Sequence, residues 1–273
     1  MRIKPLLALV IAFSLTVVKA QKTDKALLVV QYNFKHIIDT TQRDRSVARP
    51  YALVLGTDMS NYDNYYSVMS DRGTPVKTSR TDPSTGRVII VTMGGFGGEH
   101  YVKDFSSKKF TTIDYLGDSK YAIEEPLPTM EWNVVNEQKI IKEYKCQKAT
   151  TFFKGRNYTA WFTDQLPYRN GPWKLGGLPG LILEANDDNN EVVFECTSIM
   201  LATDDDKPIK VPGNVIAVDP IKFKKTQDAI KNDAKALVGA SAVRTASNIS
   251  ARSVPMPGME GLKELVLNNP IEK

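Results

Sequence analysis

Few residues of this chain have the type and spacing that catalysis requires. The 273 residues include two histidines, His36 and His100, so the side chain that most often moves protons in nucleophilic catalysis is scarce. His100 follows Glu99, and this pair would serve a hydrolase only if a serine met it in a cleft. The G-x-S-x-G and H-E-x-x-H motifs are both missing from the sequence. We therefore predict no catalytic residue and no enzyme, with a secreted hydrolase left open only on that condition.

A glycine-rich segment, Gly94-Gly95-Phe96-Gly97-Gly98, follows an apolar run and invites comparison with phosphate-binding loops. Glycines in such loops let backbone amides approach a pyrophosphate closely. The spacing does not fit, because the last glycine of the dinucleotide motif would fall at His100 and no Lys-Ser/Thr pair follows. The segment therefore predicts a hairpin tip, and no cofactor is expected.

Two acidic runs, Asp187-Asp188 and Asp204-Asp205-Asp206, carry the hard oxygen ligands that calcium prefers. Neither run has an ordered ligand spacing, and both lie in Asn/Pro-rich connections where carboxylates are solvated. We predict no metal site.

The two cysteines, Cys146 and Cys196, fall at inward positions of predicted strands. In an oxidising compartment they would close a loop of about 50 residues, worth roughly 4 kcal/mol in the loop-entropy description. Two buried free thiols are the alternative, since bonding needs Cα atoms within about 7 Å and the sequence does not fix that distance. Both states stay open.

Aromatic side chains crowd the region before a glycine-rich turn. They bring large apolar area at little entropic cost, so they either line a ligand cavity or fill a core. The residues are Trp132, Tyr158, Trp161, Phe162, Tyr168 and Trp173.

The run from Gly171 to Leu183 alternates glycine and proline with large apolar residues. Pro179 presets φ for the first corner of a turn and Gly180 suits a positive φ at the second, which predicts a type II turn leading into a strand at Leu181. We expect Gly176, Gly177, Pro179 and Gly180 to form a rigid structural turn without chemistry of its own.

Short alternating segments predict a mainly β chain. Val30 to Lys35 alternates apolar and polar residues strictly, as a strand with one wet face does. Turn residues at Gly155-Arg156-Asn157 and Asn186 to Asn190 favour antiparallel hairpins. Further strands are predicted at 51–55, 87–92, 109–115, 121–124, 142–153, 158–163, 181–185 and 191–200.

One amphipathic helix is predicted near the end of the chain. Asp219 suits the N-cap and Pro220 the first helical position, and Gly239 would end the helix. Its apolar stripe is Phe223, Ile230, Ala234 and Leu237. The lysine-rich opposite face indicates either a solvated exterior or contact with acidic lipid.

The ends of the chain differ from its middle. Arg2 and Lys4 precede an apolar run, and small residues end at Ala20, which predicts a signal peptide over 1–20 and export to the periplasm or medium. Its removal lowers the net charge from +5 to +2, with 33 basic and 31 acidic residues left, so no nucleic-acid partner is expected. No later segment is apolar enough to span a membrane. We expect a β domain with its helix over 21–238 and a flexible tail with a short helix near 260–267 over 239–273.

These residues together resemble the GLPGLI family of exported Bacteroidota proteins, whose hexapeptide stands here at Gly177 to Ile182. The similarity also covers Trp132-Asn133, Tyr144 to Ala149 and Ala160 to Thr163, and weaker echoes occur at Ser60 to Tyr62 and Asn269 to Glu272. Cys146 fits the tyrosine-x-cysteine strand of the family. The resemblance brings no active site with it.

The strand order is also similar to that of periplasmic lipoprotein carriers, whose open half-barrels hold acyl chains. We therefore predict a mainly β (α+β) fold with a curved antiparallel sheet or half-barrel. The expected function is a non-enzymatic envelope protein that binds an apolar ligand or an extended peptide. The alternative is an accessory or structural partner of an outer-membrane transport or secretion complex, docked by strand addition. The predicted lining residues are Trp132, Trp161, Trp173, Leu178 and Leu181.

Overall fold

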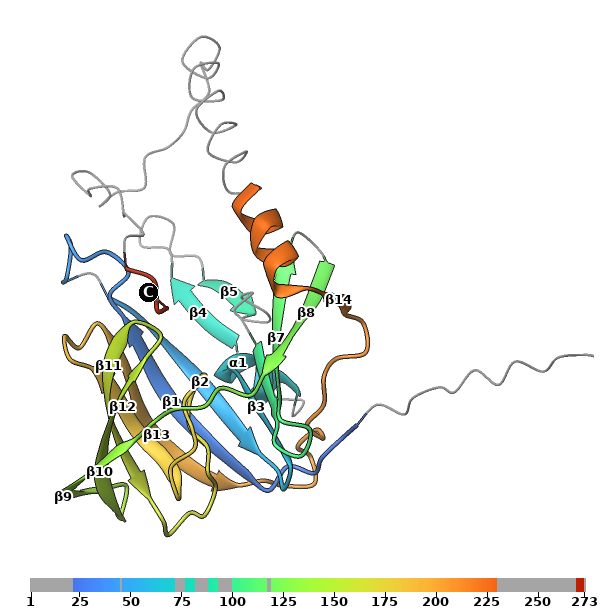
Figure 1. Ribbon diagram of the computed structural model, residues 1–273. Helices are drawn as coiled ribbons and strands as arrows, with labels where there is room; N and C mark the ends of the chain where they lie inside the picture. The colour runs from blue at the N-terminus through green and yellow to red at the C-terminus, as the bar shows by residue number, and fades with distance from the viewer. Residues whose placement is uncertain are drawn as a thin grey trace, which may run out of the picture.

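A computed structural model describes residues 22–44, 46–71, 77–81, 88–92, 100–116, 119–229 and 269–272. Twelve strands in this part of the chain form one curved sheet (Figure 1). The predicted mainly β fold with a curved antiparallel sheet is confirmed. The strands of this sheet are β1 (Leu28–His36), β2 (Val47–Leu55), β3 (Met59–Asn64), β6 (His100–Asp104), β7 (Lys109–Leu116), β8 (Ser119–Pro126), β9 (Asn133–Ile141), β10 (Tyr144–Phe153), β11 (Arg156–Thr163), β12 (Leu181–Asp187), β13 (Val192–Leu201) and β14 (Ile216–Val218).

The sheet has the order β14-β8-β7-β6-β3-β2-β1-β13-β12-β11-β10-β9. Every neighbouring pair is antiparallel except β14 and β8, which are parallel. A separate hairpin pairs β4 (Lys77–Thr81) with β5 (Val88–Thr92). The central pair, β1 with β13, joins the strands from β1 to β8 with those from β9 to β13, and β14 lies at the far edge beside β8.

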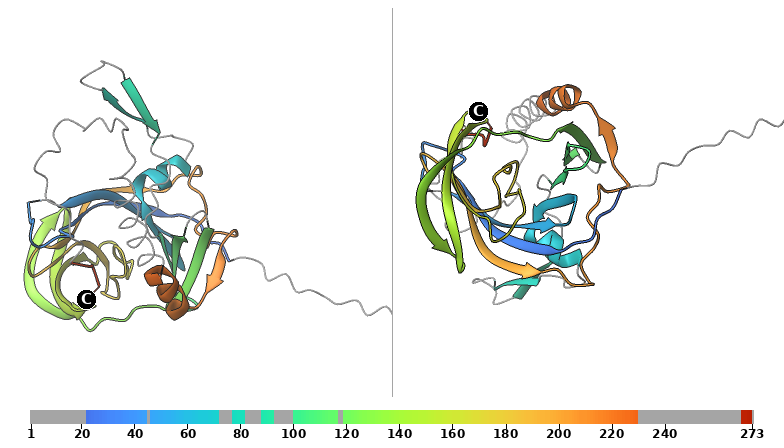
Figure 2. Two further views of the ribbon diagram at one scale, coloured as in Figure 1. Left: turned by 90° about the horizontal axis from the view of Figure 1, so that it is seen from above. Right: turned by 60° about the horizontal axis from the view of Figure 1, so that its bottom comes forward.

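Irregular pairing accompanies the curvature of the sheet. The register shifts between Gln31 and Tyr32 in β1, between Gln147 and Lys148 in β10, and between Trp161 and Phe162 in β11. An extra residue in one strand increases the local twist, so these shifts help the sheet to close on itself. Figure 2 shows the resulting bowl, with the olive-coloured connection between β11 and β12 inside its curve.

Side chains from the two faces of the sheet form two separate cores. The larger core lies on the concave face and includes fully buried Tyr32, Leu53 and Phe110. The smaller core lies on the other face, where Val68 and Met69 of α1 (Tyr65–Asp71) pack with Val54 and other strand residues. Burial of both faces explains why β2 ends in an uninterrupted apolar run rather than in alternation.

The predicted strands over described residues all occur, with small shifts at their ends. The strand predicted over 142–153 begins instead at Tyr144, because Lys142 and Glu143 take positive φ angles of 47° and 72° in the β9–β10 turn. Similarly, the turn after β10 is Lys154-Gly155, with φ angles of 49° and 76°. Arg156 and Asn157, predicted in that turn, already belong to β11.

The predicted helix near the C-terminus begins as expected at Pro220 and extends through the described residues to 229. The Asp219 carboxylate accepts hydrogen bonds from the backbone N–H groups of Ile221 and Lys222, each at 3.0 Å, as an N-cap does. Phe223 is buried against Tyr121 of β8, with ring centroids 5.3 Å apart. Gln227 donates a 2.7 Å hydrogen bond to Asp114 of β7, so the helix covers one end of the sheet.

Several predictions concern residues outside the described part of the chain. They are the signal peptide over 1–20, the Gly94 to Gly98 hairpin tip, the end of the helix at Gly239, and the tail helix over 260–267. Among the helices of the described residues, none combines the length and the apolar character that crossing a bilayer requires.

Candidate functional site: an aromatic cavity beside the interior loop

The connection between β11 and β12, residues 164–180, fills much of the concave face, and we call it the interior loop. Trp173, Leu175 and Leu178 from this loop are buried in the larger core. Strand β12 then begins at Leu181, as the turn prediction required. The concave face is therefore a packed surface with a residual cavity rather than an empty half-barrel.

A buried lysine anchors the interior loop to the sheet. Lys103 of β6 is 3% exposed, and its Nζ donates hydrogen bonds to Asn170 Oδ1 at 2.8 Å, Gly171 O at 3.1 Å and Leu175 O at 2.7 Å. Three donors thus meet three acceptors of the loop. Burial lowers the pKa of Lys103 to about 7. The sequence gives no signal for this contact, since Lys103 lies in a strand that was not predicted.

Further hydrogen bonds hold the glycines of the interior loop. The Trp132 indole donates to Gly176 O at 2.8 Å, and Arg169 donates to Gly177 O at 3.1 Å. Gly177 has a positive φ of 89°, a conformation that favours glycine. Gly180, in contrast, does not have the positive φ predicted for a type II turn. It is glycine for another reason: a Cβ there would lie 2.0 Å from the Thr163 carbonyl oxygen.

Replacing Gly180 with alanine is therefore expected to lower the free energy of unfolding by about 1–3 kcal/mol, because β11 must move away from the loop. The control is Gly177→Ala, where the nearest atom to a Cβ would be Trp132 Nε1 at an ordinary 3.9 Å and the cost is the backbone strain of about 1 kcal/mol. Urea unfolding of the two variants measures the difference. A Gly180→Ala variant as stable as the unmodified protein would contradict the close approach.

A cavity of about 300 Å³ remains on the concave face, between β1, β2, β3, β6, β13 and the interior loop. Its volume lies at the lower end of the range for small-molecule sites, which suits a ring-sized group better than a long chain. Six aromatic side chains wall it, joined by a few polar groups and one aliphatic residue. The lining residues are Phe34, Tyr51, Tyr62, Tyr101, Trp173 and Phe194, with His36, Arg49, Asp114 and Ile271.

The aromatic walls form two stacked pairs. The rings of Tyr51 and Tyr62 lie 4.9 Å apart at an interplanar angle of 4°, and those of Phe34 and Phe194 lie 4.9 Å apart at 21°. Trp173 is nearly parallel to Phe194, at 14° and 6.3 Å. Such stacking fixes the orientation of each ring, so the walls of the cavity are pre-formed.

The polar groups of the cavity differ in their surroundings. Asp114 accepts hydrogen bonds from Gln227 and from the Tyr115 backbone, and Arg49 is exposed at the mouth. Burial lowers the pKa of His36, an effect that a hydrogen bond with the Asn269 backbone partly offsets. Burial also raises the pKa of the Tyr62 hydroxyl well above its usual value. Both buried groups are therefore uncharged at neutral pH.

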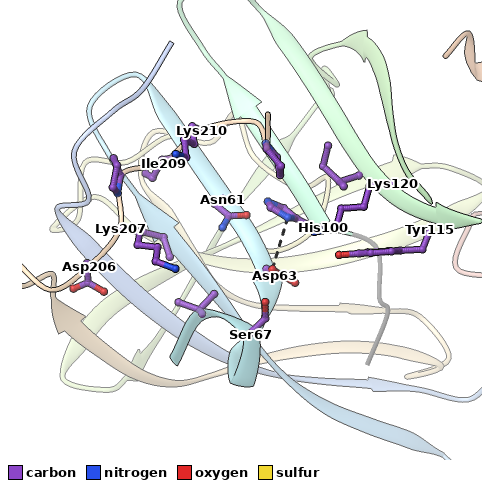
Figure 3. A pocket seen from close by; sticks show the side chains of 15 residues that line it. Asn61, Asp63, Ser67, His100, Tyr115, Lys120, Asp206, Lys207, Ile209 and Lys210 are labelled. Carbon is purple, nitrogen blue, oxygen red and sulfur yellow. Dashed lines mark ion pairs between the residues drawn. The ribbon is translucent and has the colours of Figure 1, made fainter. Parts of the chain in front are cut away.

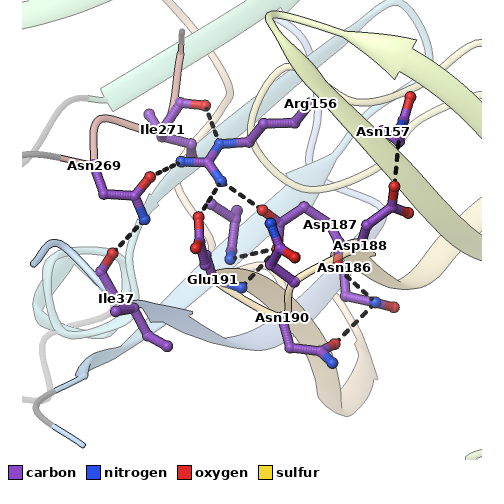
Figure 4. A network of polar contacts seen from close by, with 12 residues as sticks. Ile37, Arg156, Asn157, Asn186, Asp187, Asp188, Asn190, Glu191, Asn269 and Ile271 are labelled. Atoms are coloured by element: carbon purple, nitrogen blue, oxygen red, sulfur yellow. Dashed lines mark hydrogen bonds and ion pairs between the residues drawn. The ribbon is translucent and has the colours of Figure 1, made fainter. Parts of the chain in front are cut away.

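The last described segment, residues 269–272, closes one side of this cavity through Ile271 and is held by Arg156 (Figure 4). The guanidinium, 2% exposed, uses all five N–H donors. Nη1 donates to Asp187 and, at 3.0 Å, to Glu191; Nη2 donates to Asn269 Oδ1 at 2.6 Å and Pro270 O at 2.7 Å; Nε donates to Ile271 O at 3.2 Å. We call these contacts the C-terminal clasp.

Two further contacts complete the clasp. Asn269 donates to the Ile37 carbonyl at 2.6 Å, immediately after β1. Glu272 pairs with Lys174 of the interior loop and with Lys154, which together lower the pKa of its carboxyl although its burial raises it. The segment thereby ties β1, β11 and the interior loop together at the cavity.

A second cavity, of about 450 Å³, lies on the opposite face of the same strands, because Asn61 and Asp63 alternate with Tyr62 along β3 (Figure 3). His100 and Ser67 both line this second cavity, so it contains two of the residue types that a hydrolase uses. The His100 Nδ1 lies 3.7 Å from Asp63 Oδ2, and Ser67 lies beyond Asp63 rather than beside the imidazole (Figure 3). This order does not place the serine where His100 could take its proton, and Glu99 lies outside the described residues.

The predicted lining residues occupy different places in the structure. Trp173 lines the aromatic cavity, whereas Leu178 and Leu181 are fully buried in the core. Trp132 supports Gly176, and Trp161 is half-buried outside both cavities, with Lys139 Nζ 4.5 Å from its ring centroid. Sequence reasoning missed Phe34, Tyr51, Tyr62 and Tyr101, because strands far from the aromatic-rich region supply them.

The described acidic and thiol groups do not form a metal centre. No group of three or more His, Cys, Asp or Glu side chains in the described residues is placed to hold a metal ion. Asp187 accepts hydrogen bonds from the Glu191 and Val192 backbones and from Arg156, and Asp206 caps a turn at Thr203. These carboxylates have structural roles.

Cys146 and Cys196 are both buried free thiols in the larger core, and the disulfide that the sequence left open is not formed. Burial raises the pKa of Cys146 to about 11 and that of Cys196 to about 12.

We expect neither thiol to react with iodoacetamide at pH 8 in the folded protein, and both to react once denaturant is added. Mass spectrometry of the alkylated chain measures this. Protection in denaturant that ends only on adding a reductant would show a disulfide instead.

Comparison with known proteins adds a fold relationship. A family model described as "N-glycanase peptide, N-terminal domain" matches residues 102–225. Two crystal structures of PNGF-II, each 16% identical in sequence, are similar in structure. One gives a TM-score of 0.51 and covers 74% of this chain and 33% of that one, and the other gives 0.49, 72% and 32%. Among curated proteins, none matches this sequence. The chain thus spans about a third of the PNGF-II chain, and the first structure shows that the two share a fold.

Proposed function

We propose that this protein is a non-enzymatic binding protein of the cell envelope that holds an apolar face of its ligand in the aromatic cavity. The observation that carries the proposal is a pre-formed cavity of about 300 Å³ walled by six aromatic side chains. Burying apolar surface there contributes about 25 cal/mol per Å² before the costs of association.

The proposal also includes the cellular location of the protein. The predicted signal peptide and the resemblance to the exported GLPGLI family support export to the periplasm or the medium. The likeness to an N-terminal domain described under the name of an N-glycanase supports including glycan-bearing peptides among the ligands tested.

Tryptophan fluorescence tests the proposal directly. Replacing Trp132 and Trp161 with phenylalanine leaves Trp173, the tryptophan that lines the cavity, as the sole reporter. Titration with indole, hydrophobic peptides, glycan-bearing peptides and fatty acids is expected to shift its emission. Phe34→Leu, which removes a stacking ring but keeps the site apolar, is expected to weaken the response.

Phe152→Leu is the matched control, because Phe152 is 71% exposed and does not line the cavity. If no ligand of any of these classes changes the Trp173 emission or the melting temperature, the proposed function is wrong.

A second candidate function is an accessory or structural partner of an outer-membrane transport or secretion complex. Strand β9 ends the sheet, and its Val134 and Ile140 are exposed. An edge of nine residues with exposed apolar side chains is a template for strand addition by another chain. Val134→Lys with Ile140→Lys would then abolish co-purification of a partner, whereas Phe152→Lys would not.

A further inference from the structure

A third cavity, of about 340 Å³, lies beside the interior loop, and we call it the loop cavity. Its walls come from the end of β6, from residues 127–130 between β8 and β9, and from the interior loop. Four of its apolar lining residues are half-buried, so the folded protein leaves part of their carbon surface accessible. They are Phe105, Leu127, Pro128 and Met130. The loop cavity is therefore large and apolar enough to hold the carbon chain of a small ligand.

Two cations line the loop cavity without a counter-ion among the described residues. Lys103 is 3% exposed, and its Nζ donates to three neutral oxygens of the interior loop. Arg169 is exposed and donates to Gly177 O through Nη2, which leaves most of its five N–H donors for another partner. Within the same described residues, neither cation forms an ion pair, and the lining of the loop cavity includes no Asp or Glu.

A third cation of the lining, Lys174, differs from these two. Its Nζ lies 2.5 Å from Glu272 Oε1 and 3.9 Å from Glu125 Oε2, and Glu272 also contacts Lys154 at 3.1 Å. These two carboxylates offset the charges of Lys174 and Lys154. The positive charge of Lys103 and Arg169 remains unbalanced beside an apolar surface.

The ammonium of Lys103 would be stabilised by an anion in the loop cavity. Burial without a counter-ion disfavours the charged form and lowers the pKa of Lys103 to about 7. Gly176, which lines the loop cavity, has no side chain, and a Cβ there would lie 3.9 Å from Lys103 Nζ. An anion beside Gly176 therefore acts on the ammonium through space, and the three hydrogen bonds of Lys103 stay intact.

The charge and the shape of the lining favour one class of anion. A carboxylate matches the planar fork of the Arg169 guanidinium and can accept two hydrogen bonds from it. Lys103 is only partly protonated at neutral pH, so the site offers little more than one positive charge. This suits a singly charged carboxylate better than a doubly charged phosphate.

We infer that the loop cavity binds a monocarboxylate with an apolar chain, holding the carboxylate on Arg169 near Lys103 and the chain on Phe105, Leu127 and Met130. This second site is separate from the aromatic cavity, so the inference does not depend on the proposed function.

The test compares octanoate, octanol and octylamine, which share a chain length and differ in charge, by calorimetry. Octanoate is expected to bind at least about 10-fold more tightly than octanol, and octylamine least tightly. Arg169→Gln keeps a polar side chain at an exposed position and removes the charge. It is expected to weaken octanoate binding about 10-fold and to leave octanol binding and the melting temperature unchanged.

Arg49→Gln is the matched control, because Arg49 is an exposed arginine that lines the aromatic cavity instead. Octanoate affinity should not change in this variant. The inference is overturned if octanoate does not bind, if octanol binds equally well, or if Arg169→Gln binds octanoate as tightly as the unmodified protein. Weaker octanoate binding in Arg49→Gln alone would place the ligand in the aromatic cavity, which overturns the inference and supports the proposed function. Octanoate binding that needs Arg169, with Trp173 emission unchanged by every probe, supports the inference and contradicts the proposed function.

Discussion

Replacing Arg156 with alanine is expected to lower the free energy of unfolding by about 3–5 kcal/mol. The change leaves Asp187 and Glu191 buried without the charge that both contact, and it frees the segment 269–272 from the sheet. Urea unfolding of the variant and of the unmodified protein measures the loss.

The control for this change is Arg43→Ala. Arg43 pairs with the same Glu191 at 2.9 Å, but its side chain is 49% exposed, so the loss should stay below about 1 kcal/mol. Equal losses in the two variants would mean that the C-terminal clasp does not stabilise the fold in the way its geometry indicates.

Replacing Lys103 with methionine is expected to lower the free energy of unfolding by about 2–4 kcal/mol. Methionine keeps an unbranched apolar stem, but it leaves Asn170 Oδ1, Gly171 O and Leu175 O without their donor. Lys109→Met, at an exposed position of the next strand, is the matched control and should change stability by less than about 0.5 kcal/mol.

The contribution of Lys103 should also depend on pH. The folded-state pKa is about 7, below the value of 10.5 for an unperturbed lysine. Between these values the unfolded chain keeps a proton that the folded protein releases, so the stability of the unmodified protein rises with pH relative to Lys103→Met. Below pH 7 both states hold the proton and the difference is constant. Unfolding at pH 6.5 and 9.5 tests this, and an unchanged gap between the two proteins would refute it.

Strands with a clear apolar pattern could be predicted from the sequence. Val30 to Lys35 alternates, and Tyr51 to Leu55 is continuously apolar, because both stretches bury side chains in the cores. The helix start at Asp219 and Pro220 could be predicted as well, since capping is local. Local sequence therefore predicts an element wherever the residues of that one segment determine its secondary structure.

Strands stabilised mainly by their neighbours could not be predicted. β3 reads Met-Ser-Asn-Tyr-Asp-Asn, and β9 is largely exposed, so neither has a pattern that indicates a strand. The aromatic cavity could not be predicted from the sequence for the same reason. Phe34, Tyr62 and Trp173 meet there only because strands and a loop far apart in the chain pack together.

The interior loop illustrates how a correct residue type can be assigned the wrong cause. Gly180 was expected to need a positive φ, whereas the structure gives that φ to Gly177. The contact that requires glycine at 180 involves the Thr163 backbone, 17 positions earlier, which no local turn rule can reveal.

The central pairing of the sheet has a consequence for how the chain reaches its folded state. β1 pairs with β13 from Leu28 with Leu201 to His36 with Val192, partners 156 to 173 positions apart. Pairings this distant in sequence form slowly, because a long loop must close before they contribute stability. During synthesis β1 therefore pairs with β2 on one side and keeps its other edge unpaired until β13 has emerged.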